Sequence, residues 1–244
     1  MRTELILERS KIRLGYPIRG YVKTDKPLIL KLVITAASLL PSKARGRDPY
    51  YNVIVNYVDE LRINKSREFE FHPPEHAPPT VSTRNFLIGW SLVAGVPRFG
   101  GRILYPRNEI RLVAVPPLYP RESIEGIDFR NDYAEPGKKF TIVVNRELND
   151  PYAEVIIEEW YKGPEKGIVE AYTLDVDVEF KNFRDKTMLI FDFPPLICKD
   201  EYLIFYPLTF TTKYKNIEFG IRTKVEVGSA NLEKPITVPI QITL

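Results

Sequence analysis

Apolar and polar residues alternate with a period of two along most of the chain. In 172–180 (YTLDVDVEF) the apolar side chains point one way, and Asp175, Asp177 and Glu179 point the other way. The same alternation runs through 86–96, 219–227 and 236–244. A period of two indicates strands with one buried face, which is typical of antiparallel sheets. Only 52–63 fits a short helix as well as a strand, so the pattern predicts an all-β protein.

Proline-rich punctuation divides the chain near its middle. Residues 115–126 (VPPLYPRESIEG) hold three prolines, then polar residues and Gly126, which is typical of a linker. The halves repeat, because FEFHPP at 69–74 matches FDFPP at 191–195, an offset of 122 positions. A half of about 120 residues suits a sandwich of about seven strands. We predict two tandem immunoglobulin-like β-sandwiches, 1–117 and 127–244, joined by a linker at 118–126.

Several short motifs resemble the arrestin-like family, which comprises arrestins, α-arrestins, the arrestin-like subunit of retromer and sporulation-control proteins. The family motifs are an I-x-G-x-V strand, an F-x-F strand with a proline-rich loop, a following alternating strand, a P-G turn, a second proline pair and a terminal P-I-x-I. The matching residues are Ile18, Gly20, Val22, Phe69, Phe71, Pro78, Pro79, Thr80, Ile88, Trp90, Leu92, Pro136, Gly137, Phe140, Asn145, Phe193, Pro194, Pro195, Pro239, Ile240 and Ile242. The resemblance covers 3–243. It implies two arrestin-like sandwiches and an adaptor without catalysis.

The charge is distributed unequally between the halves. Residues 1–122 carry 20 Lys and Arg against 11 Asp and Glu, and residues 123–244 carry 15 against 21. Because the two halves have net charges of opposite sign, the sequence predicts either attraction between the domains or a basic face that binds an anionic partner. Arginine binds phosphate and carboxylate bidentately, and nearby glycines let backbone approach a ligand. The candidate residues for binding anions or partners are Lys43, Arg45, Arg47, Arg98, Arg102, Arg107 and Arg111.

Signals for catalysis and cofactors are weak. His72, Glu75 and His76 spell H-x-x-E-H, a zinc-protease pattern that needs a helix, but Pro73 and Pro74 lie between the histidines. We therefore interpret 67–82 as a strand running into a proline-rich loop, and expect no metal. The chain has no P-loop and no dinucleotide fingerprint, so we expect no cofactor. The acidic row Asp175, Asp177 and Glu179 leaves a hydrolase or carbohydrate-active protein as an alternative.

The remaining features of the composition bear on the cellular compartment and on the growth temperature of the source. The single cysteine, Cys198, excludes an internal disulfide, and no apolar run is long enough for a transmembrane helix. The charged N-terminus lacks a signal-peptide core, which favours the cytoplasm, with peripheral membrane contact as an option. One glutamine and two methionines among many charged residues are typical of a thermophile.

These observations favour a non-enzymatic adaptor or scaffold in trafficking, signalling or membrane remodelling. We expect protein partners, with anionic lipid headgroups or phosphorylated segments as options for the basic domain. Self-association as a structural protein is a further alternative. Nucleic acid is not favoured, because net charge is only +3 and no nucleic-acid motif occurs.

Overall fold

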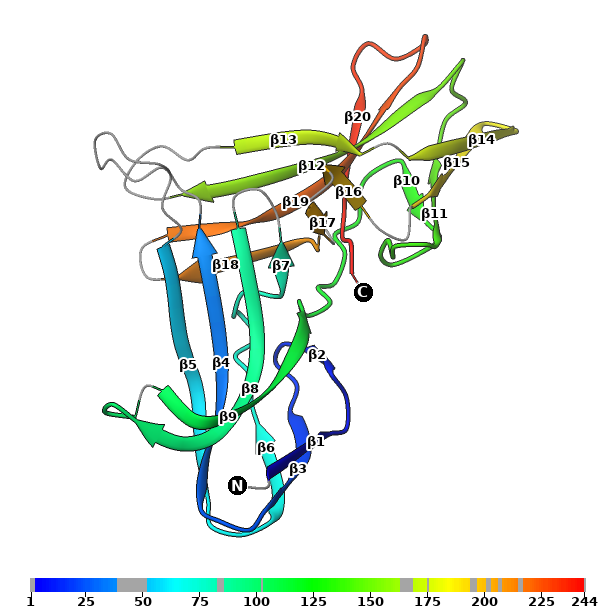
Figure 1. Cartoon of the computed structure of the whole chain (residues 1–244). Coiled ribbons are helices and arrows are strands. Elements are labelled where there is room, and N and C mark those ends of the chain that lie inside the picture. Colours follow the sequence, from blue (N-terminus) through cyan, green and yellow to red (C-terminus); the bar gives the residue numbers. More distant parts are fainter. Residues whose placement is uncertain are drawn as a thin grey trace, which may run out of the picture. The chain divides into compact units, whose positions relative to one another are not determined.

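The computed structural model describes residues 3–38, 52–82, 86–101, 103–162, 169–174, 176–193, 197–200, 203–205, 208–214 and 217–243. These residues form strands and turns, and none of them lies in an α-helix. The all-β prediction is therefore confirmed, and 52–63 is a strand. The chain divides into two compact units, Met1–Pro117 (unit 1) and Leu118–Leu244 (unit 2), drawn in Figure 1.

Unit 1 is a sandwich of a small and a large antiparallel sheet. The small sheet has the order β1-β3-β6, with β1 (Thr3–Leu7), β3 (Ile18–Thr24) and β6 (Arg67–Phe71). The large sheet has the order β2-β9-β8-β4-β5, with β7 also pairing β8. Its strands are β2 (Lys11–Arg13), β4 (Leu28–Ser38), β5 (Asn52–Ile63), β7 (Val81–Ser82), β8 (Phe86–Arg98) and β9 (Ile103–Val115). The single exception to antiparallel pairing among these strands is β2 on β9, which is parallel.

Unit 2 has the same kind of sandwich. One sheet has the order β10-β11-β15-β14, with β10 (Ile127–Phe129), β11 (Lys139–Val144), β14 (Asp177–Phe183) and β15 (Lys186–Asp192). The other has the order β13-β12-β19-β18, and β20 also pairs β19. Its strands are β12 (Tyr152–Lys162), β13 (Val169–Leu174), β18 (Phe210–Tyr214), β19 (Ile217–Gly228) and β20 (Ile236–Ile240), while β16 (Ile197–Asp200) and β17 (Leu203–Phe205) form a separate hairpin.

The pairing patterns of the two units correspond for most of their strands. The order β1-β3-β6 in unit 1 has its equivalent in β10-β11-β15, and β4-β8-β9 in β12-β19-β20. Even the parallel contact is repeated, because Ile12 pairs with Ala114 and Ala134 pairs with Ile242. Ile12 and Ala134 are separated by the same 122 positions as the Phe-x-Phe motifs. The repeat seen in the sequence is thus a repeat of strand connectivity.

The Phe-x-Phe motifs are core strands in both units. Phe69 and Phe71 of β6 are buried with ring centroids 5.8 Å apart, and Phe191 of β15 is buried against Phe140. Steric crowding explains why the I-x-G-x-V motif has a glycine, Gly20, at its centre. A Cβ on Gly20 would lie 2.7 Å from the Phe69 ring and 2.3 Å from the Ile6 carbonyl oxygen. The aromatic strand can therefore pack only against a residue without a side chain.

One sequence interpretation is wrong. The alternating run 172–180 was expected to be one strand, with Asp175, Asp177 and Glu179 on one face. Instead β13 ends at Leu174 in one sheet and β14 begins at Asp177 in the other. Alternation has the same period in both sheets of a sandwich, so it does not reveal where a chain crosses between them.

The segment 118–126, predicted as a linker, belongs to the compact unit 2. Its Arg121 guanidinium lies 3.8 Å from the centroid of the Phe129 ring and donates to the Asn131 carbonyl at 2.6 Å. Burial lowers the pKa of Arg121, and Asp132 acts in the opposite direction. The segment therefore packs on its sandwich through a cation–π contact.

Candidate interaction site on the β8–β9 hairpin

The β8–β9 hairpin bends sharply near its end. Pairing shifts register between Ala94 and Val96, so Gly95 sits in a β-bulge. A Cβ on Gly95 would lie 2.2 Å from the Pro106 carbonyl oxygen and 3.0 Å from Leu104 Cβ. The absence of a side chain at Gly95 allows the second strand of the hairpin to approach closely at the bend.

The bent end of the hairpin rests on the large sheet of unit 1. Leu104 forms a buried cluster with Val33 of β4 and Val93 of β8. Lys31, whose side chain is only 4% exposed, donates from Nζ to the Gly101 carbonyl oxygen and lies 3.3 Å from Glu60 Oε2. Apolar burial and a buried ammonium group therefore hold the hairpin end in place.

The end of the hairpin exposes aromatic and basic side chains together. Phe99 is 73% exposed and Tyr105 is 64% exposed. The Arg98 guanidinium lies 4.7 Å from the centroid of the Phe99 ring and 5.5 Å from that of Tyr105. Val96 is also exposed. We call Val96, Arg98, Phe99 and Tyr105 the hairpin patch.

The backbone at the hairpin patch is unusual. Phe99, Gly100 and Gly101 have φ values of 51°, 70° and 84°, so three successive residues lie in the left-handed region. Glycine adopts this region at little cost, but a bulky aromatic residue does so rarely. An exposed phenylalanine held in this conformation is a feature that packing does not explain.

The fold was compared with solved protein structures. The chain is similar to the crystal structure of squid arrestin with a TM-score of 0.53, over 97% of this chain and 91% of the arrestin chain. The fold is arrestin-like. Sequence identity over the match is 9%, so the likeness concerns the fold alone. No protein-family model matches the chain, and no curated protein matches its sequence.

Of the seven predicted basic residues, the structure describes Arg98, Arg107 and Arg111. Arg98 is in the hairpin patch, and Arg107, on the returning strand, forms an ion pair with Glu109. Arg111 is exposed on β9 opposite Ser91, further along the strand. Lys43, Arg45, Arg47 and Arg102 lie outside the described residues. Sequence reasoning missed Phe99 and Tyr105, although their alternation with arginines and glycines in 97–107 was a usable signal.

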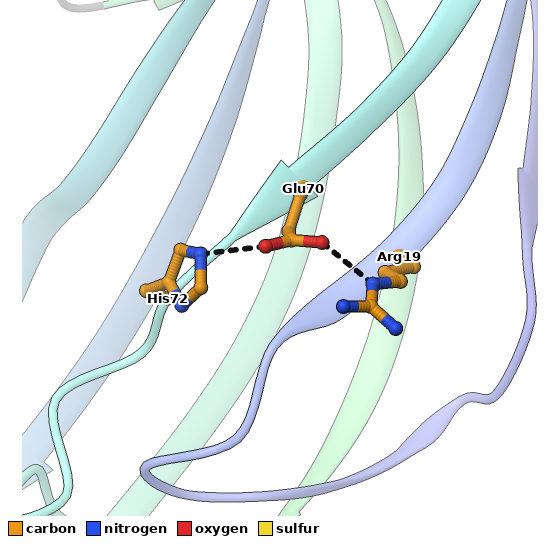
Figure 2. A network of polar contacts seen from close by, with 3 residues as sticks. All are labelled: Arg19, Glu70 and His72. Carbon is orange, nitrogen blue, oxygen red and sulfur yellow. Dashed lines mark hydrogen bonds and ion pairs between the residues drawn. The ribbon is translucent and has the colours of Figure 1, made fainter.

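The small sheet of the same arrestin-like unit carries a polar network on its exposed face. Arg19 Nε donates to Glu70 Oε2 at 2.6 Å, and His72 Nε2 lies 2.7 Å from Glu70 Oε1 (Figure 2). The hydrogen bond from Arg19 lowers the pKa of Glu70, with a smaller contribution from His72. His72 lies just beyond the end of β6, and the proline-rich segment that follows has no helix. The strand and loop predicted for 67–82 are present.

Removing the arginine is expected to raise the pKa of Glu70. In Arg19→Ala the carboxylate loses its main hydrogen-bond donor, so its pKa should rise toward the ordinary glutamate range. Because the folded-state pKa is lowered, the pair is complete above the ordinary range and is lost as pH falls through the folded value. A ¹³C NMR titration of the Glu70 carboxyl measures the shift. Lys23→Ala, on the same strand, is the control, and equal Glu70 titration curves in both variants would contradict the assignment.

The structure describes two of the three residues in the predicted acidic row. Asp177 and Glu179 are exposed on β14, where Glu179 lies 3.7 Å from Lys139 Nζ, and Asp175 lies outside the described residues. Among the residues that the structure describes, no group of three His, Cys, Asp or Glu is placed to hold a metal ion. The same residues contain no helix that could cross a membrane.

Proposed function

We propose that this protein is a non-enzymatic adaptor that binds a partner through the hairpin patch of unit 1. The observation that carries the proposal is the exposure of Phe99 and Tyr105 around Arg98 on an anchored hairpin. Aromatic residues and arginine are the side chains that contribute most to binding at protein interfaces. Because Lys31 and Leu104 hold the hairpin end, binding costs little ordering of the patch.

The charge of the patch favours an anionic partner. Arg98 is engaged with aromatic rings, which leaves its guanidinium edges available for a carboxylate or phosphate. The first half of the chain has an excess of nine positive charges, 20 Lys and Arg against 11 Asp and Glu, which steers acidic partners toward it. We propose an acidic or phosphorylated protein segment as the partner, in the cytoplasm. An anionic lipid surface is the alternative that the experiment separates.

Capture from a native lysate tests this function. A variant with Arg98→Glu, Phe99→Ser and Tyr105→Ser should retain the partner at least about tenfold less well than the wild type, because it loses the aromatic anchors and reverses the charge. The matched control is Lys23→Glu with Lys26→Glu, two exposed lysines elsewhere in unit 1. Capture is measured at low and moderate salt, since electrostatic contacts weaken with ionic strength.

The outcomes separate the alternatives. Loss in the patch variant but not in the control supports the adaptor function. Equal retention by all proteins would show that the patch is only a solvated surface. If the wild type binds anionic lipid vesicles but captures no protein from the lysate, the partner is a lipid surface and not a protein. The hydrolase alternative predicts a turnover activity that Asp177→Asn abolishes, whereas an adaptor is unaffected by that change.

A further inference from the structure

Strand β14 is an exposed edge of the smaller sheet of unit 2. It pairs with β15 on one side, and among the described residues no strand pairs with its other side. Every residue from Glu179 to Phe183 is exposed, and Phe180 is 48% exposed although it faces the same side as the buried Leu189. In Figure 1 the β14–β15 hairpin lies at the margin of its sheet. Such an edge is a template for another strand.

Strand β14 has no equivalent in unit 1, where the edge of the small sheet on this side is β6. There β5 pairs with β4 along its whole length, from Asn52 to Ile63, and the chain then turns into β6. In unit 2 the equivalent segment pairs with β12 only as far as Leu174, as strand β13. The chain then crosses to the other sheet and pairs with β15 as strand β14. The strand carries none of the proline or bulge features that commonly block edges, since its register with β15 is unbroken. With respect to the residues that the structure describes, β14 therefore remains open to pairing.

The hairpin turn determines which backbone groups point outward. Phe183 pairs with Lys186 across the two-residue turn Arg184–Asp185, and Arg184 has a φ of 56°. The closing pair of a two-residue hairpin exchanges hydrogen bonds, and bonded pairs then alternate along the ladder. The backbone groups of the odd-numbered residues of β14 thus point to β15. Those of Val178, Phe180 and Asn182 point to the open edge.

We propose that a second copy of this chain pairs antiparallel with β14, with the two-fold axis at Phe180. In this register Phe180 faces Phe180 of the second copy, and Val178 faces the second copy's Asn182. All three outward-facing residues then exchange hydrogen bonds. The two phenylalanine rings meet on the inner face of the extended sheet, which removes exposed apolar surface from water.

Charge selects this register over its neighbours. Centred on Phe180, the pair places Glu179 opposite the second copy's Lys181, and symmetry repeats the contact. Centring the pair on Glu179 or on Lys181 instead puts two like charges directly opposite each other, which is destabilising. A shift by one residue in the pairing would set the apolar side chains on the wrong face. The strand sequence is therefore complementary to itself in this register and not in the two registers beside it.

The dimer is expected to be weak. One strand pair buries less than about 1,200 Å² and corresponds to a Kd on the order of 10⁻⁴ M. Sedimentation velocity over rising protein concentration should show the wild type moving from monomer to dimer. The proposal concerns unit 2 and does not rest on the hairpin patch, so the patch variant of unit 1 should dimerise like the wild type.

Charge exchange tests the register directly. In a dimer of Glu179→Lys, a lysine at position 179 faces Lys181 of the second copy at both contacts. In a dimer of Lys181→Glu, two glutamates face each other at both contacts. Each variant should therefore dimerise at least about tenfold more weakly than the wild type. An equimolar mixture of the two variants restores both contacts as attractive pairs, so the mixture should associate at least as strongly as the wild type. Both side chains are exposed, so neither change affects the core.

A backbone variant provides the second test. Phe180→Pro removes an N–H group that points away from β15, so the monomer keeps its own ladder while the dimer loses its central hydrogen bonds. Circular dichroism checks that this variant is folded, and it should be monomeric. The proposal is overturned if the wild type stays monomeric to about ten times the expected Kd. It is equally overturned if dimerisation persists in Phe180→Pro, or if mixing the charge variants restores nothing.

Discussion

Replacing Phe140 with alanine is expected to lower the free energy of unfolding of unit 2 by about 3–5 kcal/mol. The Phe140 side chain is 0% exposed, and its ring centroid lies 6.3 Å from those of both Phe191 and Phe193. Its removal loses the transfer free energy of the ring and leaves a cavity among rings fixed by the sheet. The Arg121 guanidinium, 5.5 Å from the same ring, also loses part of its support.

Urea unfolding measures this loss, and hydrogen exchange with mass spectrometry assigns the transition to its unit. The matched control is Phe180→Ala on the same sheet, because Phe180 is half exposed and its truncation should cost only about 1 kcal/mol in dilute solution. Equal effects of the two substitutions would contradict the placement of Phe140 in the core. A change confined to the exchange of unit 1 would contradict it as well.

Adding a single methyl group at Gly95 is expected to destabilise unit 1 by about 1–3 kcal/mol. In Gly95→Ala the new Cβ would lie 2.2 Å from the Pro106 carbonyl oxygen, which belongs to the backbone and cannot move alone. The hairpin end must therefore lift from the sheet, which separates Leu104 from Val33 and Val93. Amides at 96–105 should exchange faster than in the wild type, and partner capture through the hairpin patch should fall.

Strand β8 offers its own control for this experiment. Gly89 lies in the same strand, and a Cβ at this position would meet no atom within 4 Å. Gly89→Ala should leave stability unchanged or raise it by about 0.4–1 kcal/mol, because alanine restricts the unfolded chain. If both substitutions have the same effect, the bend at Gly95 does not hold the hairpin in its position.

The duplicated connectivity explains why an edge such as β14 can arise. Each unit needs a strand that completes the larger sheet and a strand that leads back into the smaller one. Unit 1 uses β5 only for the first task, whereas unit 2 divides the equivalent run between β13 and β14. The division makes β14, rather than the equivalent of β6, the edge of the smaller sheet, and it leaves the core strands of both units equivalent.

The sequence by itself determined the class of the fold and the repeat. Alternation with a period of two needs only the strand geometry, so the β-strands and the faces of segments such as 219–227 could be predicted from residue order. In 86–96 the same pattern placed Val96 on the buried face, which is wrong, because the bulge at Gly95 shifts the register and exposes Val96. The Phe-x-Phe motifs at an offset of 122 positions and the glycine at position 20 carried the arrestin-like resemblance, because packing requires those residue types locally. The comparison with squid arrestin confirms that prediction for the fold.

The tertiary structure alone decided where these strands pair and which side chains meet. The division of 172–180 between two sheets left no trace in the alternation, because both sheets of a sandwich impose the same period. The contact between Lys31 and Gly101 joins residues 70 positions apart, and nothing in the local sequence indicates it. Exposure of Phe99 and Phe180 likewise depends on what the rest of the chain covers. Such properties arise from long-range packing, which a local pattern of residues does not encode.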